Sequence, residues 1–152
     1  MTAGTSALLS KTGFVVIGRN EGTRLEASLT AITTLCPDSY IVYVDSGSTD
    51  NSVEFAKSIG TEVVELNMEV PFTAARARNA GFDRLMETQQ DLKYVQFLDG
   101  DCQIIEGWIE SALNALSNNP ELAIVSGRRR ERFPEQTIYN TLMDIEWNTP
   151  IG

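Results

Sequence analysis

The sequence predicts an α/β protein in which helices cover both faces of a mostly parallel central sheet, giving three layers. Two observations predict this fold class. Short apolar runs typical of buried strands alternate along the chain with longer segments whose apolar residues recur at helical spacing. Turn-forming residues separate the two kinds of segment. A repeated strand–helix–strand order implies right-handed crossovers between parallel strands.

The order of these segments predicts five strands and five helices. The expected strands are Phe14–Gly18, Tyr40–Val44, Glu62–Leu66, Tyr94–Leu98 and Leu122–Ser126. The first three expected helices have apolar stripes over Leu25–Ile32, Val53–Ile59 and Ala74–Leu85. A fourth helix is expected over Gly107–Ser117, and a short fifth helix over Ile138–Glu146. Asp50 and Thr73 are the predicted caps of the second and third helices, and Gly60 is the predicted end of the second.

Composition limits the classes of function. The chain has 152 residues, which favours one domain, and we expect residues 1–12 to be a flexible lead-in to a domain over 13–152. Its net charge of −9 argues against a nucleic-acid partner, and the absence of histidine excludes an imidazole base or metal ligand. No apolar run approaches the roughly 20 residues of a membrane helix. We therefore expect a cytoplasmic protein, with attachment to the cytoplasmic face of a membrane left open.

Three polar clusters follow predicted strands directly. They are Arg19–Glu21, Asp45–Ser48 and Asp99–Asp101, after the first, second and fourth strands. Because parallel strands end at the same edge of a sheet, these clusters are expected to converge there. Open α/β sheets bind ligands at this edge, near the point where the strand order reverses.

Asp99 and Asp101 are the candidate metal ligands. Two carboxylates about 4 Å apart repel each other by roughly 4 kcal/mol at an effective dielectric constant near 20, and a divalent cation removes that cost. Carboxylate oxygens suit Mn²⁺ or Mg²⁺, which can also stabilise a departing diphosphate. The alternative is an acidic, solvated turn that caps a helix.

The other clusters have a ligand-binding and a purely structural interpretation. Asp45 could accept a hydrogen bond from a base or a ribose, or it could form an Asx-turn with Ser46–Ser48. Asn20 and Glu21 could contact a sugar or base, or cap the first helix.

Arg76 and Asn79 share a side of the third helix, where Arg76 could neutralise phosphate, pair with Asp99 or form a surface ion pair. The basic run Arg128–Arg130 with Arg132 is a solvated run or a contact to diphosphate or acceptor.

Four segments, taken together, resemble family 2 glycosyltransferases. They are Val15–Glu21 with its Asn-Glu pair, Val44–Asp50 with its Asp and Gly-Ser-Thr-Asp turn, Ala77–Gly81 with Ala-Arg-Asn-x-Gly, and Phe97–Asp101 with Phe-Leu-Asp-x-Asp. The resemblance covers roughly Phe14–Gly127 and implies a GT-A fold, which is Rossmann-like. It implies a nucleotide-diphosphate sugar as the donor.

The resemblance also implies roles for individual residues. By position, Asp45 resembles the base-binding acid, Asp99 the residue near ribose and metal, and Asp101 the direct metal ligand. Asn20, Glu21 and Arg76 resemble residues that line the nucleotide-sugar pocket. Ser46 stands where many members have a second Asp, which puts base recognition by that side chain in doubt.

The implied reaction is the metal-assisted transfer of a sugar, as by a hexosyltransferase, with inversion at the anomeric carbon. The acceptor is a glycan, a lipid or a protein. In this family the catalytic base and acceptor loops usually lie beyond the fifth strand. We therefore expect the base after residue 152 and a chain truncated after that strand, which binds the donor and is inactive alone.

Two other functions are weighed against this one. Gly22–Leu25 echoes the phosphate loop of sugar-phosphate nucleotidyltransferases, although the preceding glycine cluster and a downstream Pro-Lys are missing. A non-catalytic nucleotide-binding or interaction module also fits the short chain. A second copy of the chain is left open as a partner, because an exposed sheet edge could drive association.

Overall fold

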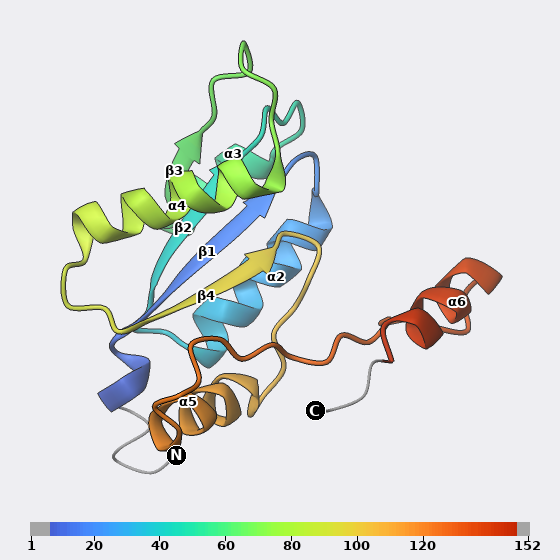
Figure 1. Ribbon diagram of the computed structural model, residues 1–152. Helices are drawn as coiled ribbons and strands as arrows, with labels where there is room; N and C mark the ends of the chain where they lie inside the picture. The colour runs from blue at the N-terminus through green and yellow to red at the C-terminus, as the bar shows by residue number, and fades with distance from the viewer. Residues whose placement is uncertain (1–6, 149–152) are drawn as a thin grey trace. The chain divides into compact units, whose positions relative to one another are not determined.

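The computed structural model describes residues 7–148 and divides the chain into two compact units (Figure 1). The first unit ends at Leu113 and the second begins at Asn114. Part of the expected lead-in is helical, since residues 7–9 form a short turn of helix and Leu8 and Leu9 pack against the core. Residues 1–6 lie outside the described residues.

The first unit is built on a four-stranded, all-parallel sheet with the strand order β3-β2-β1-β4. The strands are β1 (Thr12–Gly18), β2 (Tyr40–Asp45), β3 (Glu62–Glu65) and β4 (Tyr94–Asp99). The chain adds β2 and β3 on one side of β1 and then returns to place β4 on the other side. The strand order therefore reverses between β1 and β4, where open sheets of this type bind their ligands.

Helices cover both faces of the sheet, so the predicted three-layer α/β class is confirmed. One core lies between the sheet and α2 (Thr23–Leu35), α3 (Ser52–Ser58) and the start of α5 (Trp108–Asn118). Sheet residues Phe14, Val16 and Tyr43 face this side. The opposite core lies under α4 (Ala74–Thr88), which covers Val15, Ile17, Val42 and Val44 (Figure 1).

Gly81 of α4 faces the sheet and leaves no room there for a side chain. A Cβ atom added at Gly81 would lie only 2.4 Å from Val15 Cγ1 and 2.8 Å from Val44 Cγ2. The helix begins as predicted, with the Thr73 side chain accepting a hydrogen bond from the Arg76 amide. The small residues of this face thus set the distance between the helix and the strands.

The predicted fifth strand, Leu122–Ser126, is wrong. No strand is assigned there in the described chain, and Ile124 is 83% exposed. A strand is stable only when its backbone groups pair with a neighbour, and this apolar run has no partner strand in the structure. It belongs to the second unit, which contains the end of α5 and all of α6 (Ile138–Glu146). Helix α6 has the bounds that the sequence predicted.

None of the helices in residues 7–148 has the length and apolar content needed to cross a bilayer.

Candidate functional site

The polar edge of the sheet is the set of loops that follow β1, β2 and β4, namely residues 19–22, 45–51 and 99–102. Gly18 of β1 pairs in register with Asp45, and Ile17 pairs with Asp99. The Ser46 amide donates to Gly18 O at 3.0 Å and the Gly100 amide donates to Ile17 O at 2.7 Å, so both neighbouring loops are tied to the end of β1. The predicted convergence of the three clusters on one edge is confirmed.

Asp45 is buried, with 3% of its surface exposed, and protein donors surround its carboxylate. Oδ2 accepts hydrogen bonds from the amides of Gly47 at 2.9 Å and Ser48 at 2.8 Å. Oδ1 accepts from the Tyr43 hydroxyl at 3.0 Å and from the Ser48 hydroxyl. This is the Asx-turn of the structural interpretation, reinforced by a buried tyrosine that the sequence analysis did not connect to it.

Asn20 joins the β1–α2 and β2–α3 loops. Its Oδ1 accepts from the Thr49 amide at 2.7 Å, and its own amide donates to the Ser48 hydroxyl oxygen at 2.9 Å. Asn20 has a positive φ of 55°, a conformation that asparagine tolerates better than most residues. Asn20 therefore fixes two loops of the polar edge against each other instead of capping α2, whose N-cap is Gly22.

Asp50 is not the N-cap of α3, as the sequence predicted, but forms a hydrogen bond within the β2–α3 loop. Asn51 occupies the N-cap of α3 and makes no side-chain capping bond. Asp50 Oδ1 accepts from the Ser52 amide at 3.0 Å. Hydrogen bonding by the Ser52 side chain, and to a smaller extent by its amide, lowers the pKa of Asp50.

Glu21 lies between the β1 and β4 loops. Its Cγ would be 3.1 Å from a Cβ at Gly18 and 3.3 Å from one at Gly100, so the two glycines leave room for it. Glu21 Oε2 lies 2.8 Å from Arg24 Nη2, an ion pair without the alignment of a hydrogen bond. Burial raises the pKa of Glu21; Arg24 opposes this rise, and the negative charge of Asp101 adds to it.

Asp99 and Asp101 differ in their partners. Asp99 Oδ1 accepts a hydrogen bond from Arg78 Nη2 at 2.6 Å, and both side chains are partly exposed. Asp101 is exposed, and its Oδ1 lies 3.5 Å from Cys102 Sγ. The residue that pairs with Asp99 is thus Arg78, not Arg76, which corrects the pairing considered in the sequence analysis.

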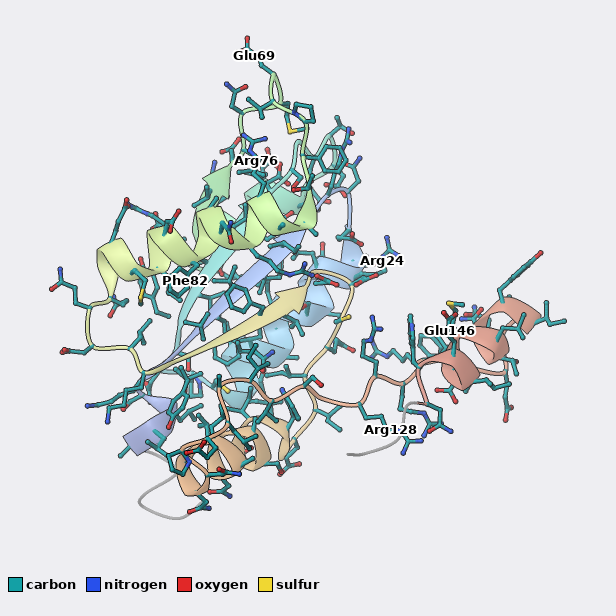
Figure 2. All side chains as sticks on the ribbon, in the orientation of Figure 1. Arg24, Glu69, Arg76, Phe82, Arg128 and Glu146 are labelled. Atoms are coloured by element: carbon teal, nitrogen blue, oxygen red, sulfur yellow. The ribbon has the colours of Figure 1, made fainter. Side chains whose placement is uncertain are left out.

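Arg76 instead binds the loop between β3 and α4. Its Nη1 donates to Val70 O at 2.9 Å and its Nη2 donates to Asn67 O at 3.0 Å. Figure 2 shows Arg76 at the start of α4, below the loop whose tip carries Glu69. The same loop touches the polar edge twice, because Met68 lies against Gly47 and the Phe72 ring lies 5.0 Å from the Arg19 guanidinium.

The basic run after α5 is largely engaged within the second unit. Arg130 makes two hydrogen bonds of 2.7 Å to the carboxylate of Asp144. The Arg129 guanidinium lies 5.0 Å from the Trp147 ring. Arg130 lowers the pKa of Asp144 to about 2, so this carboxylate is a weak base.

The polar edge has few carboxylate oxygens that could bind a divalent cation. In residues 7–148, no group of three or more Asp, Glu, Cys or His side chains is arranged to hold a metal ion. Mg²⁺ and similar cations are often held by one or two carboxylates, with water and substrate phosphate completing the shell. Asp99 and Asp101 fit that mode, in which the ligand itself supplies part of the coordination.

Comparison with models of protein families gives a match over most of the chain. The sequence model of the family described as "Glycosyl transferase family 2" matches residues 14–151. No curated protein matches the chain closely enough to be reported as a relative.

Proposed function

Because the chain belongs to glycosyl transferase family 2, we propose that it binds a nucleotide-diphosphate sugar at the polar edge and takes part in metal-assisted transfer of the sugar with inversion. The observation that carries this proposal is the register that brings Asp45 and Asp99 to either side of the end of β1. The edge lies at the reversal of strand order, which is where a nucleotide is expected in a sheet of this topology.

The proposed cation is Mn²⁺ or Mg²⁺, held by Asp101 and Asp99. When bound, it would supply positive charge to the diphosphate and so favour its departure. Asp101 is exposed and available, whereas Asp99 has to be shared with Arg78. Since two carboxylates make a weak site alone, we expect the cation to bind much more tightly together with a nucleoside diphosphate than without it.

Asp45 is proposed to read the base through the loop that it organises. Its two oxygens already accept four hydrogen bonds, which is about the capacity of a carboxylate. A base N–H therefore has to displace a donor, and the hydroxyl of Ser48 can turn its O–H away more readily than a backbone amide can. Asn20 and Glu21 are proposed to contact the nucleotide sugar from the β1 loop, and Arg76 contributes by holding the β3–α4 loop in place.

In the transfer itself, an acceptor hydroxyl would lose its proton to a base and attack the anomeric carbon in one displacement. Asp144 is a poor candidate for that base, because Arg130 holds its pKa at about 2. No described residue of this chain is proposed as the base or as a contact to the acceptor.

Calorimetry with UDP, GDP, ADP and CDP, each with and without Mn²⁺, tests the proposal. We expect one of them to bind in a Mn²⁺-dependent manner and Asp101→Asn to abolish the Mn²⁺ dependence. Asp38→Asn removes an exposed acid at the start of β2, away from the polar edge, and serves as the control. Absence of binding by a folded sample would contradict the proposal and favour an interaction module. Release of pyrophosphate from a nucleoside triphosphate and a sugar phosphate would favour a nucleotidyltransferase.

A further inference from the structure

We propose that Arg78 competes with the cation for Asp99 and binds the diphosphate once the cation has drawn Asp99 away. This inference rests on the proposed function and deepens it. It assigns to one guanidinium two successive partners, a carboxylate in the free protein and a phosphate in the complex.

The first partner is visible in the structure. Arg78 Nη2 lies 2.6 Å from Asp99 Oδ1, and the two side chains are 38% and 47% exposed. Arg78 comes from α4 and Asp99 from the end of β4, so the pair joins two elements through residues that are 21 positions apart in sequence. Because the pair is open to solvent, its carboxylate can exchange partners at a small cost in free energy.

The other guanidiniums around the edge are held by groups that a cation would not release. Arg19 lies over the Phe72 ring, and Arg76 is bound to two backbone carbonyls of the β3–α4 loop. Arg24 is paired with Glu21, a partly buried carboxylate. Arg78 differs from these three because its partner is one of the two carboxylates proposed to hold the cation.

The second partner of Arg78 follows from competition for the carboxylate of Asp99. Asp99 cannot be fully engaged by both Arg78 and a divalent cation, because both take lone pairs of the same carboxylate. A diphosphate bound to that cation lies close to Asp99, and hence close to a guanidinium that has just lost its carboxylate. The planar fork of arginine suits phosphate oxygens as well as carboxylate oxygens.

Arg78→Gln distinguishes this exchange from a structural role. With Mn²⁺ alone, measured by calorimetry or by the electron paramagnetic resonance signal of the free ion, we expect several-fold tighter binding because Asp99 no longer has a competing partner. With Mn²⁺ and the nucleoside diphosphate that the parent binds, we expect about tenfold weaker nucleotide binding from loss of a charge-assisted hydrogen bond. Arg78→Lys should recover part of the nucleotide affinity.

Arg84→Gln is the matched control. Arg84 lies on the same helix and pairs with Glu62 at 2.7 Å, so its loss removes a comparable ion pair that is not formed with the polar edge. It should leave both affinities at the parent values. Equal or weaker Mn²⁺ binding by Arg78→Gln, or unchanged nucleotide affinity, would overturn the inference while the parent's own binding still supported the proposed function. A folded parent that binds no nucleotide would overturn both.

Discussion

Asp45 and Asp99 stand on either side of the end of β1, but their carboxylates point to opposite faces of the sheet. Asp45 bonds to the Tyr43 hydroxyl on the face covered by α2 and α3, whereas Asp99 bonds to Arg78 of α4 on the other face. Alternation along each strand produces this divergence, because Asp45 shares a face with Tyr43 while Asp99 pairs in register with Ile17. Asp45 is therefore buried among protein donors, one of which a ligand has to displace, whereas Asp99 is partly exposed to a ligand.

The first prediction compares the two acids by conservative substitution. Asp45→Asn should lower the free energy of unfolding by about 1–3 kcal/mol, because an amide nitrogen would face buried donors that need an acceptor. Asp99→Asn should change it by less than about 1 kcal/mol, since only a partly exposed ion pair is lost. Urea denaturation followed by circular dichroism measures both. Equal losses would contradict the division of roles.

The second prediction concerns the close packing of α4. Gly81→Ala should destabilise the protein by about 1–3 kcal/mol, because the added methyl group collides with Val15 and Val44. Helix propensity alone predicts the opposite sign, since alanine in a helix interior is favoured over glycine by about 1 kcal/mol.

Asp83→Ala is the control for Gly81→Ala. It is an exposed position of the same helix, and its substitution should stabilise the protein slightly through propensity. A Gly81→Ala variant that is more stable than the parent would show that the helix can shift away from the sheet at little cost.

The fold was predictable wherever a pattern is local. Strands buried on both faces appear as unbroken apolar runs, so β1 and β2 were placed almost to the residue. The run Leu122–Ser126 has the same local pattern and forms no strand, because pairing depends on a neighbour that the run does not specify. Local preference decides whether a segment can be a strand, and tertiary contacts decide whether it is one.

The sequence predicted which edge of the sheet carries the candidate site, but not which side chains pair with each other there. Parallel strands guaranteed that the three clusters would meet. Arg76 and Arg78 flank Ala77 at about 100° on either side of the helix, and the flank that faces β4 depends on the strand order. That order places β4 beside β1. Because no local residue pattern predicts this neighbour, the sequence analysis missed Arg78 as the partner of Asp99.

The third prediction is a pH dependence that comes from Glu21. Its folded-state pKa is raised above the ordinary value of 4.5, chiefly by burial. Its contribution to stability is therefore complete below the unfolded-state pKa and is lost as the pH rises through the folded-state pKa. Glu21→Gln should have a higher melting temperature than the parent at pH 7, and the difference should shrink as the pH falls toward 4. A variant less stable than the parent at pH 7 would show that the Arg24 ion pair outweighs desolvation.

The last prediction concerns the loop that Arg76 holds. Arg76→Ala removes both hydrogen bonds to the carbonyls of Asn67 and Val70, and the apolar side chains of Met68 and Phe72 are already 41% and 46% exposed. Few buried contacts then remain to hold the loop, so it should open more often without global unfolding. Amide hydrogen exchange over residues 67–72 should accelerate about fivefold or more, as expected from the loss of about 1 kcal/mol of hydrogen bonding. Arg84→Ala, on the same helix, should leave that exchange unchanged, and an equal acceleration in both variants would mean that α4 as a whole had loosened.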